Sequence, residues 1–227
     1  MIAMSSYKKH VIFSLVFALP FFFQNIFALA LSVLGSSIPD LDHPIKGRRV
    51  SLIFLIGVLI LIIFYLLGLP YLIGVLLMIL AMIFYFSRHR GFSHSILGIF
   101  ILSILLTLLV ISSYFLFRDF GADERESLAL ILAFSGLMFI NRKILIPFTL
   151  LGILGVLFTP FPGLNLYNIM GPFLLGFVSH VILDLYTPSG VKFLRPFSTR
   201  TFKKGLGGFL IIIWIICAGY STMHTFF

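Results

Sequence analysis

The sequence predicts an all-α protein, a polytopic membrane helix bundle of about seven spans preceded by a short N-terminal helical hairpin. Composition is the first observation behind this prediction: 60% of the 227 residues are hydrophobic, 10% are charged, and the mean hydropathy is +1.17. The second is the recurrence of apolar runs of about 18 or more residues, which are typical of membrane helices. Because no polar segment is long enough to fold separately, we expect residues 1–227 to form a single domain.

The first apolar run contains Pro20, which either kinks one span or ends the first arm of a hairpin. A straight helix would hold His10 and Asp40 about 45 Å apart. A hairpin turning near residues 20–25 instead brings His10 back toward Asp40, and we favour it. The later spans are expected at 50–69, 71–86, 96–117, 128–140, 144–158, 169–186 and 208–226.

The basic residues predict the orientation of this bundle. All but two of the 16 Lys and Arg residues fall on the loops of one side, and only Arg118 and Arg125 fall on the other. Positive charge accumulates on cytoplasmic loops, so we expect an inner-membrane protein whose basic loops face the cytoplasm. This rule also accounts for the net charge of +9, and no motif for binding nucleic acid is present.

Three polar islands interrupt the apolar runs, and all three fall on the basic side. Gly91 allows a turn within the island at 89–95, and Ser93 is predicted to cap the helix that follows. His180 and Asp184 are four apart and therefore share one face of a helix. The islands are His89-Arg90-Gly91-Phe92-Ser93-His94-Ser95, Pro39-Asp40-Leu41-Asp42-His43, and His180 with Asp184.

Histidine and aspartate gathered in this way indicate a divalent metal site, because imidazole and carboxylate are its usual donors. Taken alone, the island at 89–95 also fits an interfacial loop whose Arg and His face water. Imidazole and carboxylate suit zinc, and carboxylate-rich variants suit manganese or magnesium. The number of candidates suits one or two ions. Asp42 is the candidate general base of the hydrolysis. Its two alternative roles are to bridge two metal ions and to orient a histidine ligand. The predicted metal ligands are His10, Asp40, His43, His89, His94, His180 and Asp184.

These islands, with Gly176-Phe177-Val178-Ser179-His180 and Thr187-Pro188-Ser189-Gly190-Val191, resemble the YdjM-type inner-membrane proteins. The resemblance covers about half the chain and implies a metal-dependent hydrolase. The family also tends to carry a histidine near its N-terminus, which His10 matches in position. Ser93 stands where threonine is common, and Arg195 stands where the family often has an aromatic residue.

Placed at the membrane interface, such a site predicts a metal-dependent hydrolase that acts on a phosphoester of a lipid or a lipid-linked substrate. Arg48, Arg49, Arg90 and Lys192 are the candidates for binding the substrate anion. Two alternatives stay open: a metal-binding membrane protein with a structural or partner-binding role, and a transporter of ions or metal. A transporter predicts ionisable residues spread through the depth of the bilayer.

Overall fold

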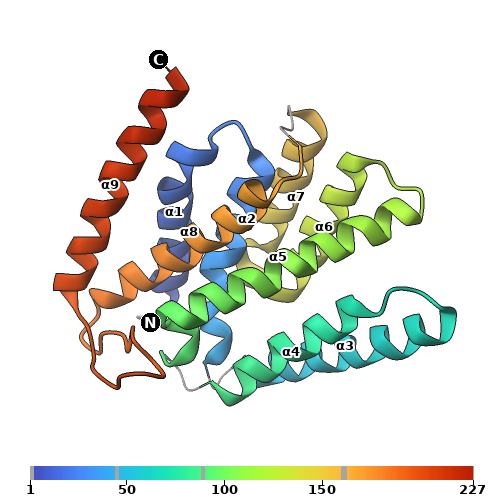
Figure 1. The fold of residues 1–227 in the computed structure, drawn as a ribbon, viewed down its shortest axis with the longest axis horizontal. Helices are drawn as coiled ribbons and strands as arrows, with labels where there is room; N and C mark the ends of the chain where they lie inside the picture. Colours follow the sequence, from blue (N-terminus) through green and yellow to red (C-terminus); the bar gives the residue numbers. More distant parts are fainter. Residues whose placement is uncertain (1–2, 44–45, 88–89, 160–162, 227) are drawn as a thin grey trace.

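The structure is a computed structural model of the chain, and it describes residues 3–43, 46–87, 90–159 and 163–226 (Figure 1). Within these ranges the chain forms nine α-helices and two 3₁₀ helices, which confirms the predicted all-α class. The elements are α1 (Ala3–Phe22), α2 (Ile26–Ser37), η1 (Pro39–Asp42), α3 (Gly47–Leu67), α4 (Leu72–Phe86), η3 (Phe92–His94), α5 (Ile96–Asp119), α6 (Glu124–Phe139), α7 (Arg142–Phe158), α8 (Leu166–Leu185) and α9 (Lys204–Phe226).

Four of the described helices, α3, α5, α8 and α9, are long and apolar enough to cross a membrane. Helix α8 is the central one: it packs against α1, α2, α5 and α9, whereas α3 and α9 leave most of their apolar surface exposed. Exposed apolar surface of this extent fits contact with lipid. Helices α4, α6 and α7 have 15, 16 and 17 residues, so the expected number of about seven spans stays a prediction.

The predicted N-terminal hairpin is present. Helix α1 ends at Phe22, the chain reverses direction at residues 23–25, and α2 runs back alongside α1 (Figure 1). Asn25 caps α2 by accepting a hydrogen bond from the backbone N–H of Ala28 at 3.0 Å. Because α2 has 12 residues, its length is about 18 Å, which is shorter than the hydrocarbon core of a bilayer. His10 and Asp40 therefore come to the same end of the molecule.

Helices α2 and α8 cross at glycines. A Cβ atom at Gly176 would lie 2.2 Å from the backbone oxygen of Ser32, and one at Gly35 would lie 2.8 Å from the backbone oxygen of Phe173. Small residues allow membrane helices to approach this closely. The crossing also determines which part of α2 faces His180, one turn farther along α8.

Gly176→Ala is expected to destabilise the protein by about 2 kcal/mol, because the added methyl group must push α2 away from α8. The midpoint of thermal or denaturant unfolding of the purified protein in detergent measures this effect. Gly219→Ala in α9 is the matched control, since a Cβ atom there meets nothing within 4 Å. Equal midpoints for the two variants would show that the α2–α8 contact tolerates extra volume.

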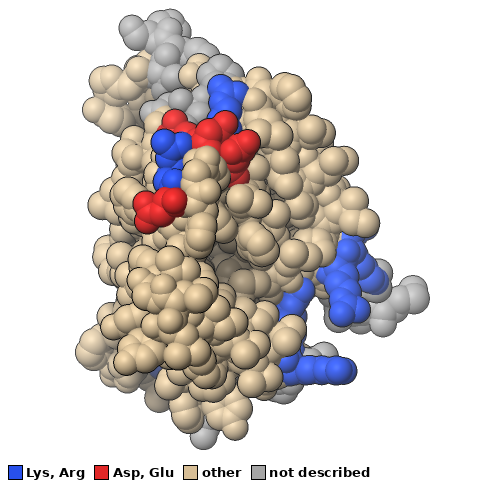
Figure 2. Space-filling model, turned by 90° about the vertical axis from the view of Figure 1, so that its right-hand side faces the viewer, with Lys and Arg blue, Asp and Glu red and all other residues tan. Residues whose placement is uncertain are grey.

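The junction between α5 and α6 carries four exposed acidic residues: Asp119 ends α5, Asp123 caps α6, and Glu124 and Glu126 lie in the first turn of α6. Figure 2 shows acidic side chains gathered with a few Lys or Arg side chains at one end of this face, while further Lys and Arg side chains lie toward the opposite end. Asp123 and Glu126 form a reciprocal capping box at the start of α6. This acidic junction marks the end of the bundle opposite the predicted cytoplasmic loops.

Single cysteines introduced in a Cys217→Ser background test that orientation. We expect Lys203→Cys to be labelled from the cytoplasmic side only, and Glu124→Cys from the outer side only, because charge bias predicts opposite sides for these loops. Both side chains are exposed, so labelling with a membrane-impermeant maleimide reports sidedness rather than burial. Labelling of both positions from the same side would refute the orientation.

Candidate metal centre

His180 is held in one orientation by α2. Its Nδ1 atom lies 2.7 Å from the backbone oxygen of Ser36. A carbonyl oxygen only accepts, so Nδ1 carries the proton and Nε2 presents its lone pair. The His180 side chain is fully buried, and Nε2 has no hydrogen-bond partner within the described residues. A buried imidazole fixed through Nδ1 with a bare Nε2 is the usual arrangement of a histidine metal ligand.

Asp184 lies at the centre of the site, one turn beyond His180 on α8. Its Oδ1 atom is 3.8 Å from His10 Nε2, and its Oδ2 atom is 3.3 Å from His94 Nε2 and 3.7 Å from His180 Nε2. The carboxylate is buried. Three histidines from separate parts of the chain therefore surround one carboxylate.

His10, His180 and Asp184 form a group that could hold a metal ion, since one ligand atom from each lies within 4.8 Å of the others. The rings of His10 and His180 stack with centroids 4.0 Å apart. Ligands of a tetrahedral zinc ion, each about 2.0–2.1 Å from the metal, lie about 3.3 Å from one another. The separations of 3.3–3.8 Å around Asp184 are close to that value and longer than ordinary hydrogen bonds. The donor set and its spacing thus fit a divalent metal.

The 3₁₀ helices η1 and η3 add Asp42 and His94 to the cluster. Asp42 Oδ2 lies 3.5 Å from His94 Nδ1 and accepts a short hydrogen bond from the Ser93 hydroxyl. The predicted capping role of Ser93 is wrong: Ser95 caps α5 by accepting from the N–H of Gly98 at 3.0 Å. Ser93 is two residues too early for this role, because η3 separates it from α5. Its side chain instead helps to position Asp42.

Asp40 completes the cluster from η1. Its Oδ1 atom is 3.7 Å from His180 Nε2, and its Oδ2 atom is 3.6 Å from Lys46 Nζ. Burial raises the pKa of Asp40, but His180 and Lys46 outweigh burial and hold it below its usual range. Burial likewise opposes the charged form of His94, yet the carboxylates of Asp184 and Asp42 raise its pKa to about 9. A metal that binds His94 must therefore displace a proton.

Arg90 links this cluster to a polar pocket. Its backbone has φ of 56°, a left-handed conformation that costs a non-glycine residue roughly 1 kcal/mol or more. In this conformation its guanidinium lies 3.4 Å from Asp184 and donates to Thr187 Oγ1 at 2.8 Å and to Ser189. A pocket of about 380 Å³ adjoins it, lined by Arg90, Ser189, Gly190, Lys192 and Thr201.

The structure places the remaining predicted site residues as follows. His43 follows η1 as its C-cap and is not part of the three-residue group, while His89 lies outside the described residues. Arg48 is exposed, and Arg49 donates at 2.7 Å to the backbone oxygen of Ile140, where α6 ends. Of the four predicted anion-binding residues, Arg90 and Lys192 thus share a pocket.

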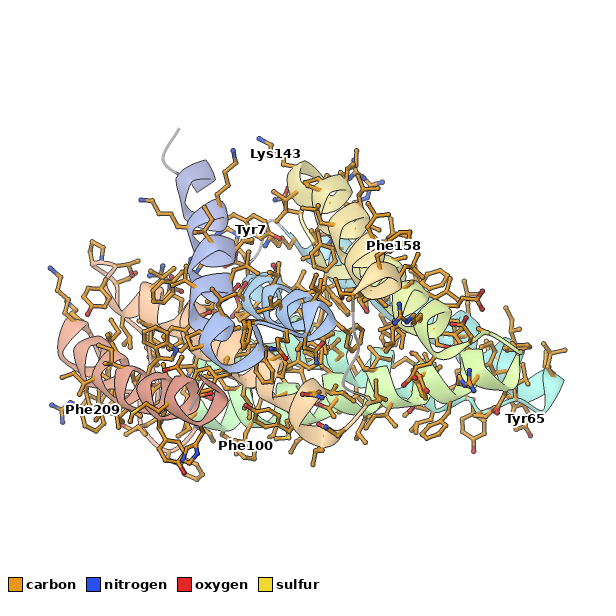
Figure 3. All side chains as sticks on the ribbon, turned by 90° about the horizontal axis from the view of Figure 1, so that it is seen from above. Tyr7, Tyr65, Phe100, Lys143, Phe158 and Phe209 are labelled. Carbon is orange, nitrogen blue, oxygen red and sulfur yellow. The ribbon has the colours of Figure 1, made fainter. Side chains whose placement is uncertain are left out.

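Tyr7 contributes a contact that sequence reasoning missed. Its hydroxyl donates to Ser37 Oγ at 3.0 Å and accepts from the backbone N–H of Asn141 at 3.0 Å. Figure 3 shows Tyr7 on α1, near the end of α7 that carries Lys143. Tyr7 and His10 are three residues apart and therefore lie on one face of α1. This spacing is the sequence signal that could have placed Tyr7 near the cluster. The tyrosine ties α1 to α2 and to the turn before α7, and so supports the position of His10.

Comparison with known proteins supports the same assignment at the level of the family. The family described as YdjM inner membrane protein matches residues 4–224, which is nearly the whole chain. No curated protein and no solved structure matches the chain. Residues 4–224 include both arms of the hairpin and every described residue of the His/Asp cluster. The chain belongs to the YdjM inner membrane protein family.

Proposed function

We propose that this protein is a membrane-embedded, metal-dependent hydrolase that acts at the cytoplasmic interface on a phosphoester of a lipid or lipid-linked substrate. One observation carries the proposal. Within the described residues, every buried ionisable side chain belongs to a single cluster, and a pocket with two basic residues adjoins it. Strongly coupled titratable groups beside a pocket are typical of active sites.

In this proposal His10, His180 and Asp184 hold the metal, with His94 and Asp40 completing the set. A bound divalent ion would supply Lewis acidity and an activated water for attack on phosphorus. Asp42 acts on the imidazole of His94, because its carboxylate faces Nδ1 while Nε2 faces Asp184. Such a carboxylate fixes the orientation of the ring and raises its basicity. Of the three roles predicted for Asp42, the geometry favours that of the orienting partner.

Arg90 and Lys192 are placed to bind the phosphate of the substrate. The Nε atom of Arg90 is buried and has no hydrogen-bond partner within the described residues. A guanidinium with a free donor beside a carboxylate cluster can bind a phosphate oxygen without leaving Asp184. Thr187 and Ser189 hold that guanidinium in place, so the pocket is preorganised for an anion.

The position of the cluster favours hydrolysis over transport. A transporter needs ionisable groups along a path through the bilayer. In the described part of the chain, the buried polar residues outside the cluster are Ser, Thr and Asn, none of which carries charge. A metal with a purely structural role is the stronger competitor, because a structural site and a catalytic site share the same ligands.

The decisive experiment combines metal analysis with hydrolysis. The purified protein, reconstituted into vesicles that contain radiolabelled phosphatidic acid, phosphatidylglycerol or a polyprenyl phosphate, should release a water-soluble labelled product. A chelator should stop this release and added zinc should restore it. Asp42→Asn should weaken metal binding by about 10–100-fold and should still hydrolyse poorly when zinc is saturating. Tight metal binding without hydrolysis of any of these phosphoesters would contradict the proposed function and favour the structural role.

A further inference from the structure

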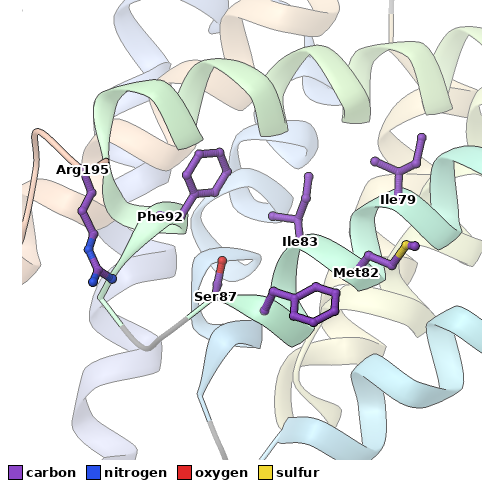
Figure 4. Close-up of a pocket in the computed structure, with 7 residues that line it drawn as sticks. Ile79, Met82, Ile83, Ser87, Phe92 and Arg195 are labelled. Atoms are coloured by element: carbon purple, nitrogen blue, oxygen red, sulfur yellow. The ribbon is translucent and has the colours of Figure 1, made fainter. Parts of the chain in front are cut away.

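An open groove of about 810 Å³ runs beside the metal centre, along the C-terminal half of α4 (Figure 4). Its wall is apolar, and Ile79, Met82 and Phe86 are exposed, as they would be toward lipid. The labelled residues follow one another in the figure from Ile79 at one end to Arg195 at the other. The stretch of α4 from Ile79 to Phe86 is about 10 Å long. The groove is therefore lined by apolar side chains along α4 and by the cationic side chain of Arg195 at one end.

Arg195 has no acidic partner among the described residues. Within the described ranges no carboxylate lies within 4.0 Å of it. The chain has only seven Asp and Glu residues. Four are exposed between the end of α5 and the first turn of α6, and the other three belong to the His/Asp cluster. No Asp or Glu side chain of the described residues pairs with Arg195, so its guanidinium can pair with an anion from outside the chain.

The groove and the metal centre share the element η3. Phe92 lines the groove, and His94, two residues later, lies 3.3 Å from Asp184. The segment that carries Arg195 is tied to the same place, because the N–H of Ile96 donates to the backbone oxygen of Phe193 at 2.9 Å. A molecule in this groove would lie directly beside the site loop.

We propose that this groove binds one acyl chain of an anionic phospholipid, with the lipid phosphate at Arg195. The chain lies against Ile79, Met82 and Phe86, and the hydroxyl of Ser87 lies near the cationic end of the same groove. Each methylene of the acyl chain that leaves water favours binding through the hydrophobic effect. The guanidinium of Arg195 donates a charge-assisted hydrogen bond to the phosphate. This binding site goes beyond the proposed function, because Arg195 lies outside the pocket in which Arg90 and Lys192 would bind the phosphate of the substrate.

Photocrosslinking in vesicles tests the binding. The full chain is reconstituted in phosphatidylcholine vesicles with a small fraction of phosphatidylglycerol that carries a photoreactive group on one acyl chain. A diacylglycerol with the same acyl chain is the uncharged probe. We expect crosslinks to Ile79, Met82 or Ile83 with phosphatidylglycerol, and roughly tenfold fewer after Arg195→Gln or with diacylglycerol. Arg200→Gln is the matched control, since Arg200 lies on the same loop and stacks over Phe202.

Two results would overturn the proposal. One is equal crosslinking of the groove and of the exposed apolar face of α9, which would show only unspecific contact with lipid. The other is groove crosslinking that Arg195→Gln leaves unchanged. The same measurement in a His180→Ala chain separates the two proposals, because lipid binding should persist there while hydrolysis is lost. If binding persists and the wild-type protein hydrolyses no phosphoester, only the proposed function fails.

Discussion

Asp184→Ala is expected to remove bound metal from the purified protein and to abolish any hydrolysis. The Asp184 carboxylate lies 3.3–3.8 Å from nitrogen atoms of His10, His94 and His180. Its removal takes away the one ligand that all three imidazoles share. Loss of an orienting partner alone costs about 10–100-fold in metal affinity, so loss of this ligand should cost more than about 100-fold. Metal content by mass spectrometry and zinc affinity by competition with a chromophoric chelator measure the effect.

Glu124→Ala controls for the loss of a carboxylate elsewhere in the chain. Glu124 is exposed in the first turn of α6, at the acidic end of the molecule, so its replacement should change neither metal content nor activity. The Asp184→Ala protein should still insert into the membrane, because α8 becomes more apolar. Full metal content in Asp184→Ala would show that the cluster is not a metal site.

His10→Ala is expected to weaken zinc binding by more than about 100-fold as well, although His10 lies 170 residues from His180 in the sequence. The hairpin of α1 and α2 brings its ring to within 4.0 Å of the His180 ring, and the side chain is buried. The same chelator competition gives the affinity. The expected loss would show that the N-terminal hairpin completes the site.

Lys9→Ala is the adjacent control, because Lys9 is exposed on α1 and should leave zinc affinity unchanged. An unchanged affinity in His10→Ala would remove His10 from the ligand set. The remaining residues, Asp40, His94, His180 and Asp184, would then have to bind the ion without it.

Much of the fold was predictable because membrane helices have a strong hydropathy signal. The hairpin was also predictable, since Pro20 indicated a turn near residues 20–25, although the structure keeps Pro20 inside α1 and places the turn after Phe22. The number of spans was not. Helices α4, α6 and α7 are shorter than the bilayer core, so hydropathy alone does not say how each meets the membrane.

The site was predictable at the level of its residue types and less so at the level of its partners. His180 and Asp184 share a helix face, so periodicity places them together. The bond from His180 to the Ser36 backbone depends on the glycine crossing of α2 and α8, which no local pattern specifies. For the same reason the contact of Arg49 with Ile140, 91 residues away, could not be foreseen.

The coordination of the bound metal, measured by X-ray absorption on zinc-loaded protein, tests the central claim most directly. We expect imidazole nitrogens and carboxylate oxygens at about 2.0–2.2 Å, and one imidazole fewer in the His180→Ala protein. Cys217, the single cysteine of the chain, is exposed on α9, so no sulfur ligand should appear. A zinc shell that contains sulfur, or only oxygen, or that His180→Ala leaves unchanged, would contradict the account.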